Sequence, residues 1–300
     1  QKELFTSPQG LRWSLVYRSF HRMLLSTGKY SKLLEWLLLG NMATYFPNSI
    51  RINLMNKILT IWAIPRSTST AFEWMMRQRG DLECFHEPFG EAWYQGESPL
   101  WPRLQKDSVR TPGLSLESVL LNLKQTASKK PVFTKDFPHY VSTIWTEEVL
   151  SHFNHSFLIR DPAKTISSIY KHFPDFVIEE LGYLEQRELF NKVYSISNNV
   201  PVVIDSDDLL ENPYEMIEAY CNAVGIPFIE EALSWKPGKR DEVSWWDGGS
   251  FHENLRNSDG LKPQKRNYVE VNDLPDRVKK IYDIVMPHYN ELYAHRLKVK

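Results

Sequence analysis

The sequence is poor in cysteine, with only Cys84 and Cys221 among 300 residues. Two cysteines cannot build a disulfide framework, and this pair lacks metal-ligand spacing, so we expect ordinary buried thiols in a reducing compartment. The motifs H-E-x-x-H and G-x-S-x-G are absent, which leaves metalloprotease and hydrolase functions without support. The Walker sequence G-x-x-x-x-G-K-[ST] is absent too, which disfavours ATP hydrolysis and phosphoryl transfer. We expect no metal site.

An excess of charge of one sign is also missing, because 36 Lys and Arg side chains balance 37 Asp and Glu side chains to a net charge of −1. This balance gives no general attraction to nucleic acid or to an anionic membrane. The longest apolar cluster near the N-terminus, residues 33–43, contains Glu35 and Asn41 and is shorter than the roughly 20 residues that span a bilayer. We expect no nucleic-acid partner, no membrane anchor or signal peptide, and a cytoplasmic location. The oligomeric state is left open.

The sequence does contain a repeated alternation of short apolar runs and helical patterns. Such alternation is typical of an α/β domain, so we predict a parallel β-sheet of about five strands flanked by helices on both faces. The predicted strands are residues 58–64, 81–85, 131–135, 156–160 and 201–205. The predicted helices are residues 71–79, 114–124, 141–153, 162–172, 176–196, 212–224 and 276–296.

Composition assigns the remaining stretches. Two helical patterns precede the first strand, so we expect residues 1–56 to form an N-terminal helical extension packed on a main domain of residues 57–300. Residues 90–112 are rich in Trp, Pro and Gly, which indicates an irregular excursion such as a lid or substrate loop. The aromatic and basic stretch 234–270 predicts an irregular region that covers substrate or nucleotide. Its candidate nucleotide contacts are Lys265 and Arg266.

The turn after the first strand has the composition of an anion-binding site. Pro65 ends the apolar run, and a basic, hydroxyl-rich segment leads into a helix. Free backbone N–H groups at a helix N-terminus attract phosphate or sulfate, and hydroxyls and a guanidinium add donors at the same place. An N-capped turn without a ligand is the alternative. The candidate residues are Arg66, Ser67, Thr68, Ser69 and Thr70.

A second candidate anion site lies at the end of the fourth predicted strand. Arg160 ends this strand, and Asp161 followed by Pro162 is a good helix start. Ser168 lies eight residues after Arg160 in the expected helix, so its hydroxyl and the guanidinium can contact one phosphate group together. A structural ion pair with a carboxylate is the alternative for Arg160. The ends of two strands therefore carry candidate anion-binding groups.

Taken together, these motifs resemble the sulfotransferases that use 3′-phosphoadenosine 5′-phosphosulfate. PRSTST is similar to the 5′-phosphosulfate loop of that family, and RDPAKTISS, which carries Arg160 and Ser168, is similar to its 3′-phosphate motif. HEPF, VVIDSDDLLENP, CNAVGIPF and ALSWKPG are similar to segments of a bacterial-type branch. The resemblance covers residues 59–238. It implies a P-loop-like sulfotransferase fold, 3′-phosphoadenosine 5′-phosphosulfate as co-substrate, and no metal.

Two departures from the family pattern concern the cation of the loop and the catalytic base. Common cytosolic members have lysine where this chain has Arg66, so the charge is kept while its geometry changes from a point to a planar fork. Many members also use a histidine just after the third strand, where this chain has KDFPH. Other members have a Glu-Pro pair after the second strand, which makes Glu87 the first candidate base. The further candidates are His86 and His139 as bases, Asp136 as a less favoured base, and Lys135 as a second cation.

The resemblance implies transfer of a sulfuryl group to a hydroxyl or amine of a small-molecule or carrier-tethered acceptor, in specialised metabolism. On this hypothesis the PRSTST loop stabilises the departing nucleotide, and Arg160 and Ser168 hold its 3′-phosphate. Glu87 would act near neutral pH if the apolar side chains of Phe85 and Phe89 raise its pKa. A nucleotide-binding scaffold that has lost transfer is the main alternative, and a phosphotransferase is the weaker one.

Overall fold

The computed structural model describes residues 57–99, 110–243, 252–263 and 268–299. The N-terminal helical extension predicted for residues 1–56 lies outside these ranges, as do Lys265 and Arg266. Within the described ranges, no helix combines the length and the apolar character needed to cross a membrane.

The centre of the described chain is a parallel sheet of five strands in the order β2-β3-β1-β4-β5. The middle strand, β1, is buried along its whole length because it has a strand on each side and helices over each face. The predicted α/β fold is therefore confirmed. The strands are β1 (Ile58–Ala63), β2 (Glu83–His86), β3 (Val132–Asp136), β4 (Phe153–Ile159) and β5 (Val202–Asp205).

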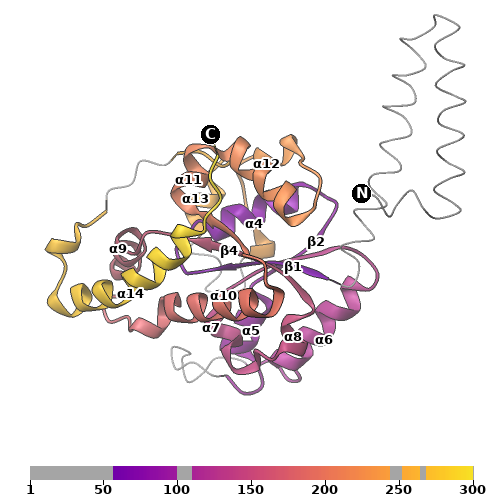
Figure 1. Ribbon diagram of the computed structural model, residues 1–300, viewed down its shortest axis with the longest axis horizontal. Coiled ribbons are helices and arrows are strands. Elements are labelled where there is room, and N and C mark those ends of the chain that lie inside the picture. The colour runs from indigo at the N-terminus through magenta and orange to yellow at the C-terminus, as the bar shows by residue number, and fades with distance from the viewer. Residues whose placement is uncertain (1–56, 100–109, 244–251, 264–267, 300) are drawn as a thin grey trace, which may run out of the picture. The chain divides into compact units, whose positions relative to one another are not determined.

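Helices connect the strands and cover both faces of the sheet. Figure 1 shows α4 and α12 on one side of the sheet and α6 and α10 on the other. Parallel strands require such crossovers, because the chain must return to the same end before the next strand begins. The described helices are α4 (Ser69–Gln78), α5 (Pro88–Gln95), α6 (Leu116–Ala127), α7 (Pro138–Val141), α8 (Glu147–Leu150), α9 (Pro162–His172), α10 (Tyr183–Ser197), α11 (Ser206–Glu211), α12 (Pro213–Val224), α13 (Glu253–Arg256) and α14 (Asp276–Ala294).

The helix predicted for residues 141–153 is wrong. The chain there forms α7, a single 3-10 turn and α8, and β4 already begins at Phe153. Thr146 starts a new helix at this point, because its hydroxyl accepts the backbone N–H of Val149 at 3.2 Å. A capping residue inside an apolar pattern has therefore divided one expected helix into short pieces.

Three further elements differ from the predictions. The helix expected at 176–196 begins only at Tyr183, because Gly182 takes a left-handed φ of 70° immediately before it. The irregular stretch expected at 90–112 begins inside α5. α11 follows β5 without a loop, and the Asp205 carboxylate caps it by accepting two backbone N–H groups.

The topology of the sheet determines where a ligand can bind. The chain leaves β1 toward β2 on one side and leaves β4 toward β5 on the other, so the direction of winding reverses between β1 and β4. Ligands of open parallel sheets bind outside the carboxyl ends of the strands at this reversal. The loop from β1 to α4 and the first turn of α9 both begin there.

Candidate active site

The loop between β1 and α4 has a backbone conformation that few side chains tolerate. Arg66 and Thr68 have φ values of 62° and 68°, in the left-handed region, although neither is a glycine. The hydroxyl of Ser67 stabilises the turn by donating to the Ile64 carbonyl at 2.7 Å. Strained residues of this kind cluster at functional sites, where the surrounding structure holds them in place. The loop leads directly into α4, whose first backbone N–H groups have no partner within the helix.

The two predicted anion sites meet at Arg66. The Nε atom of Arg66 donates to the Ser168 hydroxyl of α9 at 3.0 Å. Arg160, which follows β4 and is only 1% exposed, donates through Nη1 to the backbone carbonyl of Arg66. The structure thus brings together three residues that the sequence assigned to two separate motifs.

Tyr268 belongs to the same site and is not identified by the sequence patterns. Its hydroxyl accepts a hydrogen bond from Arg160 Nη2, and the centre of its ring lies 5.5 Å from the guanidinium carbon and 5.9 Å from Lys164 Nζ. The next residue, Val269, donates its backbone N–H to the Ser167 hydroxyl at 2.7 Å. The only sequence feature that could have identified Tyr268 is its position near the end of the basic stretch expected to cover the nucleotide. These contacts hold Tyr268 and Val269 against α9.

Two buried polar atoms at this site have no protein partner among the described residues. They are the hydroxyl oxygen of Thr68 and Nε of Arg160. Buried polar atoms are nearly always hydrogen-bonded, so a ligand that accepts hydrogen bonds from these two atoms would complete the site. A phosphate or sulfate oxygen accepts hydrogen bonds from a hydroxyl and from a guanidinium. The residues present therefore fit an anionic ligand next to the N-terminus of α4.

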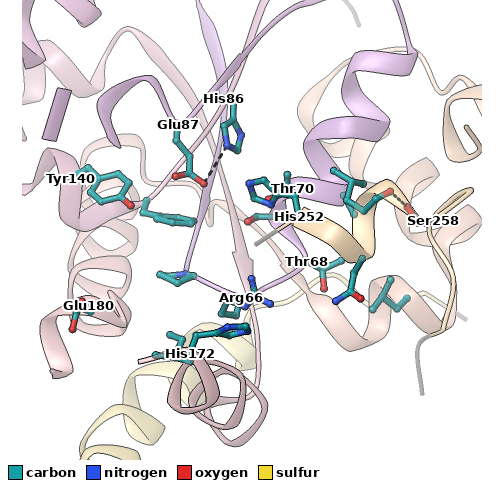
Figure 2. Close-up of a pocket in the computed structure, with 18 of the residues that line it drawn as sticks. Arg66, Thr68, Thr70, His86, Glu87, Tyr140, His172, Glu180, His252 and Ser258 are labelled. Atoms are coloured by element: carbon teal, nitrogen blue, oxygen red, sulfur yellow. Dashed lines mark hydrogen bonds and ion pairs between the residues drawn. The ribbon is translucent and has the colours of Figure 1, made fainter. Parts of the chain in front are cut away.

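A pocket extends from this loop along the carboxyl ends of the strands (Figure 2). Arg66 and His252 lie in its middle part, Tyr140 lies toward one end, and Ser258 lies toward the other. His86 and Glu87 line the pocket as well, so the anion-binding groups and the candidate bases share one cavity.

One wall of the pocket, the aromatic wall, consists of Tyr94, Phe137, His139 and Tyr140. The ring centres of Phe137 and Tyr140 are 5.3 Å apart, and those of His139 and Tyr140 are 4.3 Å apart. Burial lowers the pKa of His139 to about 4, against a smaller opposite effect of Glu87, so its ring is neutral at pH 7. The candidate base His139 therefore lies in an apolar wall that suits an uncharged molecule.

Glu87, the first candidate base, has a different environment from the one predicted. Its φ is 44°, its backbone N–H donates to the Lys135 carbonyl at 2.8 Å, and its carboxylate pairs with the fully buried Lys135 ammonium. Burial acts to raise the pKa of Glu87, but Lys135 and nearby histidines together lower it below its ordinary value. The expectation that Phe85 and Phe89 raise this pKa is wrong, because the ion pair outweighs the desolvation.

His86, the last residue of β2, lies beside Glu87. Its Nε2 is 3.9 Å from a carboxylate oxygen of Glu87, and Figure 2 shows the two side chains facing each other. Its ring meets that of His252 edge-on, with centres 5.5 Å apart. On the other side, Nδ1 is 2.6 Å from Oε2 of Glu73, a fully buried carboxylate of α4. The sequence patterns do not identify Glu73, because it lies in a helix whose buried face is recognised only by its apolar residues.

Asp136, the least favoured candidate base, accepts hydrogen bonds from neighbouring backbone N–H groups. Its carboxylate accepts the backbone N–H groups of Phe89 at 2.8 Å and Phe137 at 3.0 Å. Burial raises the pKa of Asp136 well above its usual range. These contacts connect the end of β3 to the start of α5.

Comparison with known proteins identifies relatives for most of the chain. The family model described as "Sulfotransferase domain" matches residues 56–295. Two proteins of Arabidopsis thaliana, branched-chain-amino-acid aminotransferase-like proteins 1 and 2, are 28% and 27% identical over 239 and 245 residues. These matches cover 77% and 80% of this chain but 42% of each relative. The chain thus spans less than half the length of these two relatives.

Two solved structures are similar at low sequence identity. The sulfotransferase domain from the curacin biosynthetic pathway is 15% identical with a TM-score of 0.44, and the match covers 76% of this chain and 97% of that one. The sulfotransferase domain from the Synechococcus PCC 7002 olefin synthase is 15% identical with a TM-score of 0.46, and the match covers 81% of this chain and 95% of that one.

Proposed function

This chain belongs to the family of sulfotransferase domains, and we propose that it moves a sulfuryl group from 3′-phosphoadenosine 5′-phosphosulfate to a hydroxyl group. The observation that carries the proposal is the meeting of Arg66, Ser168 and Arg160 beside the first turn of α4. Two guanidinium groups, a hydroxyl and the helix N–H groups suit a ligand with two anionic ends. A nucleotide with a 5′-phosphosulfate and a 3′-phosphate has these two ends, whereas ATP has no 3′-phosphate.

The residues of the site divide between the two ends of the donor. We assign the 5′-phosphosulfate to Arg66, to the loop residues Ser67, Thr68, Ser69 and Thr70, and to the N–H groups of α4. The Thr68 hydroxyl gains in this way the partner that it lacks among the described residues.

We assign the 3′-phosphate to Arg160 and Ser168, with Tyr268 holding Arg160 in place. Nε of Arg160, which also lacks a partner in the described ranges, is the atom best suited to this phosphate. Lys265 and Arg266 remain candidates for the same phosphate from the covering stretch.

Sulfuryl transfer to an alcohol needs charge stabilisation on one side and a base on the other. The bond between sulfur and the bridging phosphate oxygen breaks while sulfur bonds to the acceptor oxygen. Arg66 and the helix N–H groups stabilise the charge that develops on the departing phosphate. On the acceptor side, the hydroxyl proton goes to the pair formed by Glu87 and His86, which lines the same pocket.

The aromatic wall supports an acceptor with an apolar body. A charged acceptor would lose its hydration against Phe137, Tyr140 and the neutral His139 without gaining an ion pair there. An uncharged alcohol or phenol loses less and gains contact area. A free small molecule and the apolar end of a carrier-tethered chain meet this requirement equally.

A transfer assay tests the proposal. The protein is incubated with 3′-phosphoadenosine 5′-phosphosulfate and a panel of phenols, aliphatic alcohols, sugars and amines, and sulfated products are measured by mass spectrometry. We expect sulfation of the phenols and apolar alcohols, with a loss of about 100-fold or more in turnover in Arg66→Ala, the magnitude typical of removing one charge-stabilising donor. Arg187→Ala, which changes an arginine outside the pocket lining, is the control. Tight nucleotide binding without any transfer would favour the scaffold alternative.

A further inference from the structure

Five charged or titratable side chains form a connected series from α4 through β2 to β3, and all of them except Arg77 are buried. Arg77 donates to Oε1 of Glu73 from Nε at 2.9 Å and from Nη2 at 2.8 Å. Oε2 of Glu73 contacts His86, His86 faces Glu87, and Glu87 pairs with Lys135. Each carboxylate therefore has a cation of its own, and the imidazole lies between the two carboxylates.

We infer that Glu73 is a positioning residue that makes His86 the base of the transfer, an inference that rests on the proposed function. An ionised carboxylate only accepts hydrogen bonds, so the 2.6 Å contact between Glu73 Oε2 and His86 Nδ1 requires the hydrogen to be on Nδ1. In a neutral imidazole the other nitrogen, Nε2, then carries no hydrogen and can accept one. Nε2 lies on the side of Glu87 and of the pocket. The geometry thus presents the basic nitrogen to the acceptor.

The groups that face His86 agree with this assignment. Burial acts to raise the pKa of Glu73, but its cationic and imidazole neighbours lower it, so the carboxylate is ionised. Burial is also the main cause that lowers the pKa of His252 to about 4 and raises that of Cys84 to about 12, so neither is charged at pH 7. His86 therefore lies between two ionised carboxylates, Glu73 on the side of Nδ1 and Glu87 on the side of Nε2.

His86 also borders a second hollow besides the substrate pocket. Among the described residues, it is the one that lines both the substrate pocket and a neighbouring hollow. Three carboxylates, Glu91, Asp241 and Glu242, line that hollow together with Arg77. His86 thus lies between the substrate pocket and a hollow lined mainly by charged side chains.

The step balances with His86 as the base. The acceptor O–H bond breaks and its proton goes to Nε2, the acceptor oxygen bonds to sulfur, and the electrons of the sulfur–bridging oxygen bond stay on the nucleotide phosphate. The imidazolium then lies between Glu73 and Glu87 and returns its proton to water. Glu87 is the weaker base, because its charge is already neutralised by Lys135.

The position of the proton can be measured without any acceptor. In Glu73→Gln, the two donors of Arg77 attract the amide oxygen, so the amide NH2 faces Nδ1 of His86 and the proton moves to Nε2. Imidazole ¹⁵N–¹H NMR spectra report this tautomer, and His86→Gln identifies the signal. We expect Nδ1–H in the wild type and Nε2–H in Glu73→Gln. An Nε2–H tautomer in the wild type would overturn the inference, whether or not the variant folds.

Kinetics provide the second measurement. We expect kcat of Glu73→Gln to fall about 100-fold, at the lower end of general-base effects, with unchanged affinity for the nucleotide. Glu73→Asp should lose less. Glu83→Gln makes the same change at an exposed position of β2 and should have no effect.

A double variant separates positioning from a general structural effect. Adding Glu73→Gln to His86→Gln should cost no further activity, because the tautomer no longer matters. An additive loss, or a kcat within threefold of wild type in Glu73→Gln alone, contradicts the inference. A wild-type protein that sulfates no acceptor contradicts the proposed function instead, while the nitrogen spectra still decide the position of the proton.

Discussion

Arg66 connects the two halves of the anion site through its own side chain and backbone. Its Nε contacts Ser168, and its carbonyl accepts a hydrogen bond from Arg160. A guanidinium has five donors in a planar fork, so it can contact a neighbouring hydroxyl and a ligand together, whereas the lysine of common cytosolic members is a point charge. Arginine at this position therefore ties the 5′ loop to the helix assigned to the 3′-phosphate.

Arg160→Ala tests that assignment at a single residue. The variant removes charge-assisted hydrogen bonds, which contribute about 1.5–3 kcal/mol each, so the affinity for adenosine 3′,5′-bisphosphate should fall by about 10-fold to 100-fold. Titration calorimetry measures the change, with Tyr268→Phe as a milder variant that removes only the hydroxyl that contacts Arg160. Binding as tight as in the wild type would remove Arg160 from the 3′-phosphate site.

Asp205 makes a prediction about pH and stability. Burial raises its pKa to about 6, although it accepts hydrogen bonds from two backbone N–H groups and from Tyr289. A carboxyl with a higher pKa in the folded state binds its proton more tightly there, so its contribution to stability is lost as pH rises from about 4 to about 6. Asp205→Asn keeps an oxygen to cap α11 and removes this titration.

The stability of Asp205→Asn relative to the wild type should therefore increase by about 2–3 kcal/mol between pH 4 and pH 7, at roughly 1.4 kcal/mol per pKa unit. Urea denaturation over this range measures it. If the difference in unfolding free energy between Asp205→Asn and the wild type did not change with pH, ionisation of Asp205 would not destabilise the folded state as predicted.

At the scale of elements, the sequence predicts strands better than it predicts short helices. All five strands are found, because buried parallel strands are short apolar runs bounded by polar residues. α11 and the division at Thr146 are missed, because capping hydrogen bonds between near neighbours decide them and leave no apolar periodicity. Glu73 is missed for a related reason: a helical period identifies a buried face, but a charged residue on that face depends on partners from other elements.

Gly182 tests how the start of α10 supports the aromatic wall. Its φ is 70°, and a Cβ atom there would lie 2.7 Å from Nδ1 of His139. Gly225, which ends α12, has a φ of 78° and nothing within 4 Å of such an atom. Alanine at either position bears the left-handed backbone cost of about 1–2 kcal/mol, and only Gly182→Ala must also displace the wall.

We therefore expect Gly225→Ala to lose about 1–2 kcal/mol of stability with unchanged transfer kinetics. Gly182→Ala should lose more stability and raise the acceptor KM. Chemical denaturation and acceptor titrations on the two variants measure this. Equal effects at the two glycines would show that His139 does not shape the acceptor site.

At the scale of the whole molecule, the site depends on contacts that no local pattern contains. Arg66 and Ser168 are 102 positions apart, and Arg160 and Tyr268 are 108 apart. They meet because β4 pairs with β1 and because the segment after residue 267 packs on α9. The family resemblance assigned Arg66 and Ser168 to different ends of one nucleotide and did not predict the contact between them. Tyr268, outside the span of that resemblance, required the structure.

Because several distant segments converge on the proposed nucleotide site, binding of the nucleotide should stabilise the whole fold. A ligand that binds only the folded state at 100 times its Kd adds about 2.7 kcal/mol, which corresponds to a rise in Tm of about 5 °C for a chain of this size. Adenosine 3′,5′-bisphosphate should produce this rise in a thermal-shift experiment. AMP at the same concentration should produce much less, since it lacks the group assigned to Arg160.

Arg160→Ala should bring the rise with the bisphosphate close to that with AMP, because the 3′-phosphate then loses the buried guanidinium assigned to it. An equal rise in Tm with the two nucleotides in the wild type would mean that the protein recognises the 5′-phosphate alone. The contacts of Arg160 with the Arg66 carbonyl and with Tyr268 would then serve to hold the loop against α9, and donor selectivity would have to come from another part of the chain.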